Sequence, residues 1–267
     1  MARYKGIIPF SGKMGGLIFR NRKGQGEVSE EPKKPIVQSE ATKKSGRDFG
    51  RAGKLVGRIK RAFNGMVSDH GDVDFTSRLQ SVMMAVFNSI GVEKLGEKQA
   101  WDGDLKLLEG FQFNVLTHLD LLLWQKPKLT VEVATGLEVY FAEADVKSLV
   151  RKEKHNTAAV FEVTVGIFNL DNGTDEVVRG KKMTVNLEAD QFKGGTLKIP
   201  VTFGGRQLVV LGVGVHYLSK DERILNAKEK AAAFTYARLL NDGELVSFIP
   251  RKLVKKEPAQ DDGLDWV

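Results

Sequence analysis

Residues 161–167, FEVTVGI, decide the fold class of this chain. The apolar side chains of this stretch lie at alternate positions: Phe161, Val163, Val165 and Ile167. This period of two is typical of a strand with one buried face. Asn172-Gly173 follows closely and is a strong signal for a tight turn between antiparallel strands. The stretch therefore predicts a β-hairpin.

The same alternation continues on both sides of this hairpin. It recurs at Leu129, Val131 and Val133; at Leu137, Val139 and Phe141; at Val185 and Leu187; at Leu197, Ile199, Val201 and Phe203; and at Val213, Val215 and Tyr217. Strands spaced by roughly ten residues, with turns and no helices between them, favour an antiparallel sandwich. We therefore expect residues 129–250 to form an antiparallel β-sandwich. Within it, residues 227–240 fit either a helix or a final strand.

Before the strands, the hydrophobic period is that of helices. Residues 38–66 carry apolar side chains at steps of three and four: Phe49, Ala52, Val56, Ile59, Phe63 and Met66. Ser39 is a suitable N-cap, and a second helix is expected over residues 76–90. The two predict a helical hairpin over residues 38–95. The connector 96–128 shows no clear period.

One face of the first predicted helix is basic. Five cations share helical spacing: Arg47, Arg51, Lys54, Arg58 and Arg61. They indicate contact with a polyanion or a neighbouring subunit, although a solvated face has the same pattern. Beside them stands a stripe of glycines: Gly46, Gly50, Gly53 and Gly57. Helical glycine is unfavourable, so the stripe indicates either a close approach to the helix or a broken helix.

Charge is distributed unevenly between the two ends of the chain. The net charge is +7. Residues 1–66 carry 16 Lys/Arg and 5 Asp/Glu, whereas the remaining residues carry 25 and 29. Residues 1–37 are rich in glycine and cations with few apolar groups, which predicts an extended basic arm holding at most a marginal hairpin. The tail, residues 251–267, turns from basic to acidic and carries Leu264 and Trp266, a pattern typical of a docking peptide or a solvated end.

Complete catalytic or metal-binding motifs are missing from the sequence. There is no cysteine, and the four histidines, His70, His118, His155 and His216, lack the spacing of a helical metal site. No cofactor, metal or catalytic residue is therefore predicted, and we expect a protein that is not an enzyme. Neither a signal peptide nor a transmembrane segment is predicted. We therefore expect a location in the cytoplasm or in a particle assembled there.

The N-terminus resembles that of a family of uncharacterised bacterial proteins. The resemblance rests on Gly6-Ile7, Phe10-Ser11-Gly12-Lys13-Met14-Gly15 and Pro32-Lys33-Lys34, and it covers about the first 35 residues. It implies a C-terminal immunoglobulin-like β domain, and it transfers no catalytic residue.

Together these features predict an α+β protein with an extended basic N-terminal arm, a helical hairpin and an antiparallel immunoglobulin-like β-sandwich. The expected function is that of a structural or assembly subunit of a particle, filament or phage-type complex, contacting neighbouring subunits or a polyanion through its basic region. The alternative is a nucleic-acid-binding architectural protein. An enzyme whose site is too dispersed to recognise is a third reading.

Overall fold

The computed structural model describes residues 2–4, 11–22, 24–32, 37–152, 155–219 and 229–250. They form an α+β protein in which all pairing between strands is antiparallel. The chain divides into two compact units, residues 1–43 and 44–267.

The N-terminal unit is a small four-stranded sheet rather than an extended arm with a single hairpin. Its strands are β1 (Ala2–Tyr4), β2 (Gly12–Met14), β3 (Leu17–Arg22) and β4 (Gln25–Glu30), in the order β1-β4-β3-β2. The turn between β2 and β3 is tight, because Gly15 and Gly16 both have positive φ, which favours glycine. Gly12–Met14 pairs with residues 17–19 as a hairpin.

The second unit begins with three helices, which confirms the predicted change to helical period. They are α1 (Glu40–Ala62), α2 (Asn64–His70) and α3 (Phe75–Asn88). The Ser39 Oγ accepts a hydrogen bond from the Thr42 backbone N–H at 3.2 Å, as expected of an N-cap. Phe49, which was predicted to lie on the buried stripe, is instead 55% exposed. The apolar stripe of α1 therefore begins at Ala52.

The connector between helices and strands has short 3-10 turns and lies along a strand of the main sheet. The turns are η1 (Val92–Lys94), η2 (Ala100–Asp102), η3 (Leu105–Leu108) and η4 (Leu119–Leu121). The Gly110 and Phe113 backbone N–H groups donate to the carbonyls of Phe234 and Ala232, both at 2.8 Å. These bonds pin the connector to the strand that contains residues 230–241.

The remaining elements form the β layers of the second unit. They are β5 (Lys128–Glu132), β6 (Gly136–Phe141), β7 (Ala144–Asp145), α4 (Val146–Leu149), β8 (Ala158–Asn169), β9 (Asp175–Arg179), β10 (Met183–Asn186), β11 (Gln191–Phe192), β12 (Gly195–Ile199), β13 (Arg206–Leu218), β14 (Lys230–Asn241) and β15 (Glu244–Val246). The main sheet has the order β10-β8-β13-β14-β15, with β9 also pairing with β8. A smaller sheet has the order β12-β6-β5, and β7 pairs with β11. The ambiguous stretch 227–240 is thus a strand over its described part.

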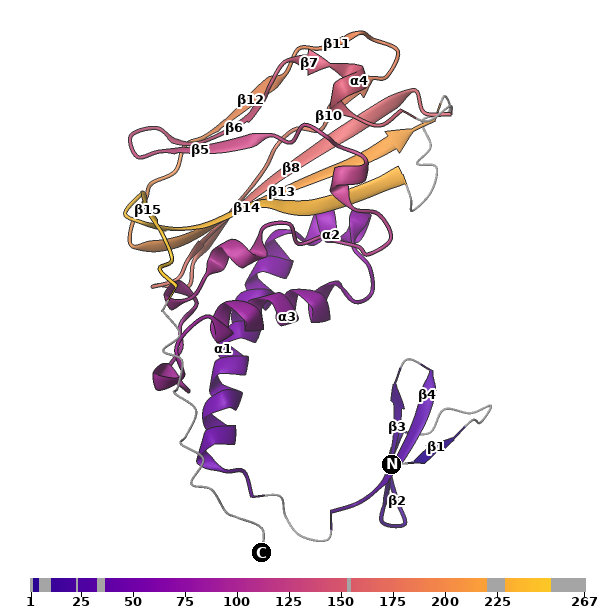
Figure 1. The fold of residues 1–267 in the computed structure, drawn as a ribbon, viewed down its shortest axis with the longest axis vertical. Coiled ribbons are helices and arrows are strands. Elements are labelled where there is room, and N and C mark those ends of the chain that lie inside the picture. Colours follow the sequence, from indigo (N-terminus) through magenta and orange to yellow (C-terminus); the bar gives the residue numbers. More distant parts are fainter. Residues whose placement is uncertain are drawn as a thin grey trace, which may run out of the picture. The chain divides into compact units, whose positions relative to one another are not determined.

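The long strands β8, β13 and β14 form the middle of three layers, with the helices on one face and the small sheets on the other (Figure 1). Nearly every residue of β8 and β13 is buried. The alternation in FEVTVGI had predicted half-buried strands. Instead, both faces of these strands are buried, so the side chains at the positions between the apolar ones also lie inside the protein.

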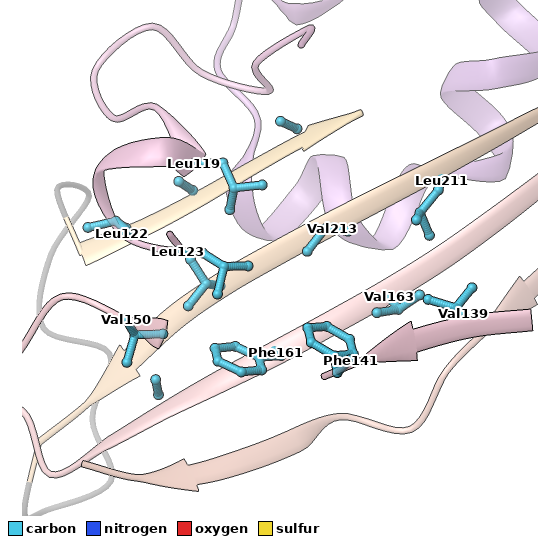
Figure 2. Close-up of a cluster of buried hydrophobic side chains, with 14 of the residues drawn as sticks. Leu119, Leu122, Leu123, Val139, Phe141, Val150, Phe161, Val163, Leu211 and Val213 are labelled. Carbon is cyan, nitrogen blue, oxygen red and sulfur yellow. The ribbon is translucent and has the colours of Figure 1, made fainter. Parts of the chain in front are cut away.

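The core between the main sheet and the small sheets consists of apolar side chains and Tyr217, whose hydroxyl donates to the Leu122 carbonyl at 3.0 Å. Figure 2 shows Phe141 of β6 beside Phe161 of β8, whose rings stack with centroids 5.6 Å apart. Leu119, Leu122 and Leu123 of the connector close one end of this core. Burial on this scale, at roughly 25 cal/mol per Å² of apolar surface, is what holds the two sheets together.

On the helix side, glycines of the sheet make room for large side chains. A Cβ at Gly212 would lie 2.7 Å from Cε1 of Phe63, and one at Gly214 would lie 3.0 Å from Nε2 of His70. Phe63 is fully buried and packs edge-on against Phe234, at a centroid distance of 4.9 Å. The end of α1 and all of α2 can therefore approach the sheet only because β13 lacks side chains at these positions.

Candidate functional site

The five cations predicted to form one contact face are divided between two roles. Arg47, Lys54 and Arg61 are exposed, and within the described ranges none of them takes part in an ion pair. Arg51 and Arg58 are only partly exposed and bind other parts of the chain. The free basic face is therefore narrower than the sequence pattern alone indicated.

The two bound arginines join α1 to distant loops. Arg58 donates from Nε to Asp175 Oδ1 at 2.8 Å, and from its terminal nitrogen to the carbonyls of Asn169 at 2.7 Å and Thr174 at 3.1 Å. Arg51 donates to the Gly96 carbonyl at 2.7 Å. An arginine fork that satisfies several carbonyls and a carboxylate at once is a structural tie.

The glycine stripe of α1 lies within one continuous helix, so the predicted alternative of a broken helix is not observed. A Cβ at Gly46 or Gly50 would meet no described atom within 4 Å. At Gly53 and Gly57 the first contacts would be side-chain atoms 3.6 Å away, from Gln80 and Arg61. Approach of a partner to this stripe stays a prediction. The tail residues Leu264 and Trp266 lie outside the described residues, and so does their predicted docking.

A second group of chemically active side chains lies where α2 meets the main sheet, and the sequence did not single it out. His70 ends α2, Glu162 stands near the start of β8, and His216 stands near the end of β13. All three are buried, and the atoms that each offers as a ligand lie within 4.8 Å of one another. We call these residues the His-Glu-His cluster.

The geometry of the His-Glu-His cluster centres on the carboxylate. Nε2 of His70 lies 3.4 Å from Oε2 of Glu162, and Nδ1 of His216 lies 3.6 Å from Oε1. Lys182, whose side chain is 58% exposed, places its ammonium against the same Oε1 and lies 3.9 Å from Asp69. Nδ1 of His70 has no hydrogen-bond partner among the described residues. The carboxylate is therefore shared by three basic groups.

Electrostatics keep this carboxylate ionised. Burial alone raises the pKa of Glu162, but hydrogen bonds from His70 and Lys182 and the charges of both outweigh burial and lower the pKa to about 2. Burial lowers the pKa of His216 below its ordinary value, which favours the neutral imidazole. An anionic oxygen beside a neutral imidazole nitrogen is the kind of donor pair that a divalent metal ion prefers.

Sequence reasoning missed the His-Glu-His cluster because its members are far apart in the chain and follow no local motif. Glu162 sits inside the stretch that decided the fold, but a half-buried strand would have placed it in solvent. The sequence offered one signal for the cluster, which is a glutamate within a long and mostly apolar strand. Such a group must find partners when both faces are covered.

Comparison with known proteins gives no match that bears on this arrangement. No family model matches the chain, and no curated protein matches it. Within the described residues, no helix has the length and apolar character needed to cross a membrane. Any function must therefore be inferred from the fold and the side chains themselves.

Proposed function

We propose that this protein is a non-enzymatic assembly subunit whose N-terminal sheet binds a neighbouring subunit of a particle, filament or phage-type complex. The observation that carries the proposal is the lack of a core in this sheet. Among its residues whose side chains are described, only Gly26 is buried, and Met14 and Leu17 are 67% and 36% exposed. A small single-layer sheet is marginal until its apolar face is covered. A neighbouring subunit would supply that cover.

The three exposed cations of α1 support a second contact, with an acidic surface of a neighbour. Arg47, Lys54 and Arg61 lie on the first helix after the N-terminal unit. The same observation favours the runner-up, a nucleic-acid-binding architectural protein, since three cations at helical spacing also fit phosphates. The two functions predict different effects of nuclease. It should dissociate an assembly that nucleic acid holds together and leave an assembly of protein subunits intact.

We also propose that the β domain is immunoglobulin-like, as the resemblance of the N-terminus to the bacterial family implies. The packing of two antiparallel layers around one apolar core supports this. Such a body is rigid and suits a subunit that presents binding segments at its periphery. Because a fold by itself does not fix a function, the proposal depends on the experiment that follows.

The experiment compares the full chain with a chain lacking residues 1–37, each measured by light scattering after size-exclusion chromatography, with and without nuclease. We expect nuclease-resistant oligomers of the full chain and monomers of the shortened one, with equal thermal unfolding of the second unit. A control variant reverses Arg47, Lys54 and Arg61 to Glu and tests the helix contact alone.

Two outcomes would contradict the assembly function. A full chain that stays monomeric at the highest concentration reached would leave the N-terminal sheet without a partner copy. Oligomers that disappear with nuclease, and also in the triple charge reversal, would transfer the function to nucleic-acid binding. Limited proteolysis provides a further check, because residues 1–37 should be cut in the monomer and protected in the oligomer.

A further inference from the structure

We propose that the His-Glu-His cluster is a binding site for a divalent transition-metal ion, of which Zn²⁺ is the best match. The donors are two imidazole nitrogens and one carboxylate oxygen, a set typical of zinc sites with three protein ligands. They come from α2, β8 and β13, so one ion would tie the helix layer to the two strands beneath it. This inference does not depend on the assembly function.

The spacing of the donor atoms fits such an ion. Zinc binds nitrogen and oxygen at about 2.0–2.2 Å, so adjacent donors in a tetrahedral site lie about 3.3–3.6 Å apart. Nε2 of His70 lies 3.4 Å from Oε2 of Glu162 and Nδ1 of His216 lies 3.6 Å from Oε1, so each imidazole is at about this distance from a different oxygen of the carboxylate. With one carboxylate oxygen as the donor, the three ligand atoms lie within 4.8 Å of one another. Small rotations about the side-chain torsions of the three residues would bring the donor atoms to the spacing of a tetrahedral site.

The surroundings preserve space for the first ligand. His70 is 1% exposed, and its Nε2 stands 3.0 Å from the point where a Cβ of Gly214 would lie. A side chain at this position of β13 would press on the imidazole, so glycine leaves it the space it occupies beside the carboxylate. The backbone carbonyl of His70 also accepts a hydrogen bond from Nδ2 of the buried Asn114 at 2.9 Å, which fixes the end of α2. The ligand is thus held in place from both sides.

Lys182 is the expected competitor of the metal ion. Its ammonium contacts Oε1 of Glu162, the oxygen that faces His216. Repulsion between the ammonium and a metal ion at the same oxygen would weaken the binding of both. Lys182 lies largely in solvent, and Asp69 stands close enough to receive the displaced ammonium. Binding of the ion would therefore release Lys182 toward Asp69.

The test measures Zn²⁺ binding to the full chain by isothermal titration calorimetry after removal of metals with a chelator. Co²⁺ is the second probe, because its visible absorption reports the coordination geometry. We expect one ion per chain, with binding lost in Glu162→Gln and His216→Ala. Lys182→Ala should bind about two- to fivefold more tightly, because the largely exposed Lys182 ammonium, which solvent screens, no longer competes for Glu162. His118→Ala with His155→Ala is the matched control, since both histidines are exposed and lie outside the cluster.

Circular dichroism checks that each variant is folded, and Lys182→Ala keeps the test decisive if the buried variants fail to fold. Absence of Zn²⁺ binding to the wild-type chain would overturn the proposal and leave the cluster as a buried ion-pair network. So would binding that persists in folded His216→Ala but is lost in the control variant. Unchanged or weaker affinity in Lys182→Ala would also contradict it, because the ion would then not use Glu162.

Discussion

The contact between Gly212 and Phe63 gives the sharpest stability prediction, through the substitution Gly212→Ala. The new Cβ would lie 2.7 Å from Cε1 and 3.0 Å from Cδ1 of Phe63, and 3.2 Å from Sδ of Met66. Real Cβ contacts are essentially never under 3.0 Å, so part of the helix layer must shift. Phe63 cannot rotate away freely, because it is enclosed by Phe113 and Phe234.

Overpacking of a closed core typically costs about 1–3 kcal/mol. The φ of Gly212 is not positive, so alanine meets no backbone strain, and the loss comes from packing, partly offset by the lower entropy of the unfolded chain with alanine. For a domain of this size, 1 kcal/mol corresponds to about 2–4 °C in Tm. We therefore expect a decrease of about 2–12 °C in thermal melting, and a lower urea midpoint at an unchanged m value.

The matched control is Gly204→Ala, because a Cβ at Gly204 meets nothing within 4 Å and its φ is also not positive. This control should change Tm little. Equal stability of Gly212→Ala and the wild-type chain would refute the claim that the helices rest on the glycine positions of β13. A Gly212→Ala variant more stable than wild type would do so more strongly.

Three further predictions concern α1 and the tail. Gly50→Ala should stabilise the protein by about 0.5–1 kcal/mol in chemical denaturation, because a Cβ there meets only open space within the described chain; a loss of assembly in this stable variant would show that a partner approaches the helix there. Arg58→Ala should destabilise the protein by about 1–3 kcal/mol through its orphaned partners, while the exposed Arg61→Ala stays within about 0.5 kcal/mol; equal melting of the two variants would contradict the division of the basic face. Deletion of residues 259–267 should weaken association without changing the melting of the second unit, and a loss of folding would place Trp266 in the protein's own core.

The sequence was sufficient for the order and type of most elements because their signals are local. The alternation at Val139 and Phe141, the Asn172-Gly173 turn and the cap at Ser39 each depend on a few neighbouring residues. The strand β14 was ambiguous, since alanine favours helices when nothing else decides. Its state is set by pairing with β13 along its length, which no local pattern reveals.

The candidate site was beyond local reasoning for the same physical reason. Whether Glu162 faces solvent depends on the helix layer, and that layer is contributed by residues about a hundred positions earlier in the chain. Likewise, Arg58 looked identical to Arg61 in the helical pattern. The contact with Asp175, the first residue of β9, separates the arginine that holds the fold from the one that is free for a partner. The spacing of charges in the sequence identifies the basic face of a helix. Tertiary contacts decide which cations of that face remain free to bind a partner.

The coverage of the long strands has a consequence for how copies of this protein meet. β9 and β10 share the outer edge of β8, and on the other side β15 and the backbone of residues 110–113 cover β14. A long strand with unpaired N–H and C=O groups is a template for runaway addition of strands from other chains, the route to amyloid-like aggregates. Here both flanks of the longest strands are closed by short segments. The edges of the longest strands of the second unit are therefore closed to the addition of strands from other copies.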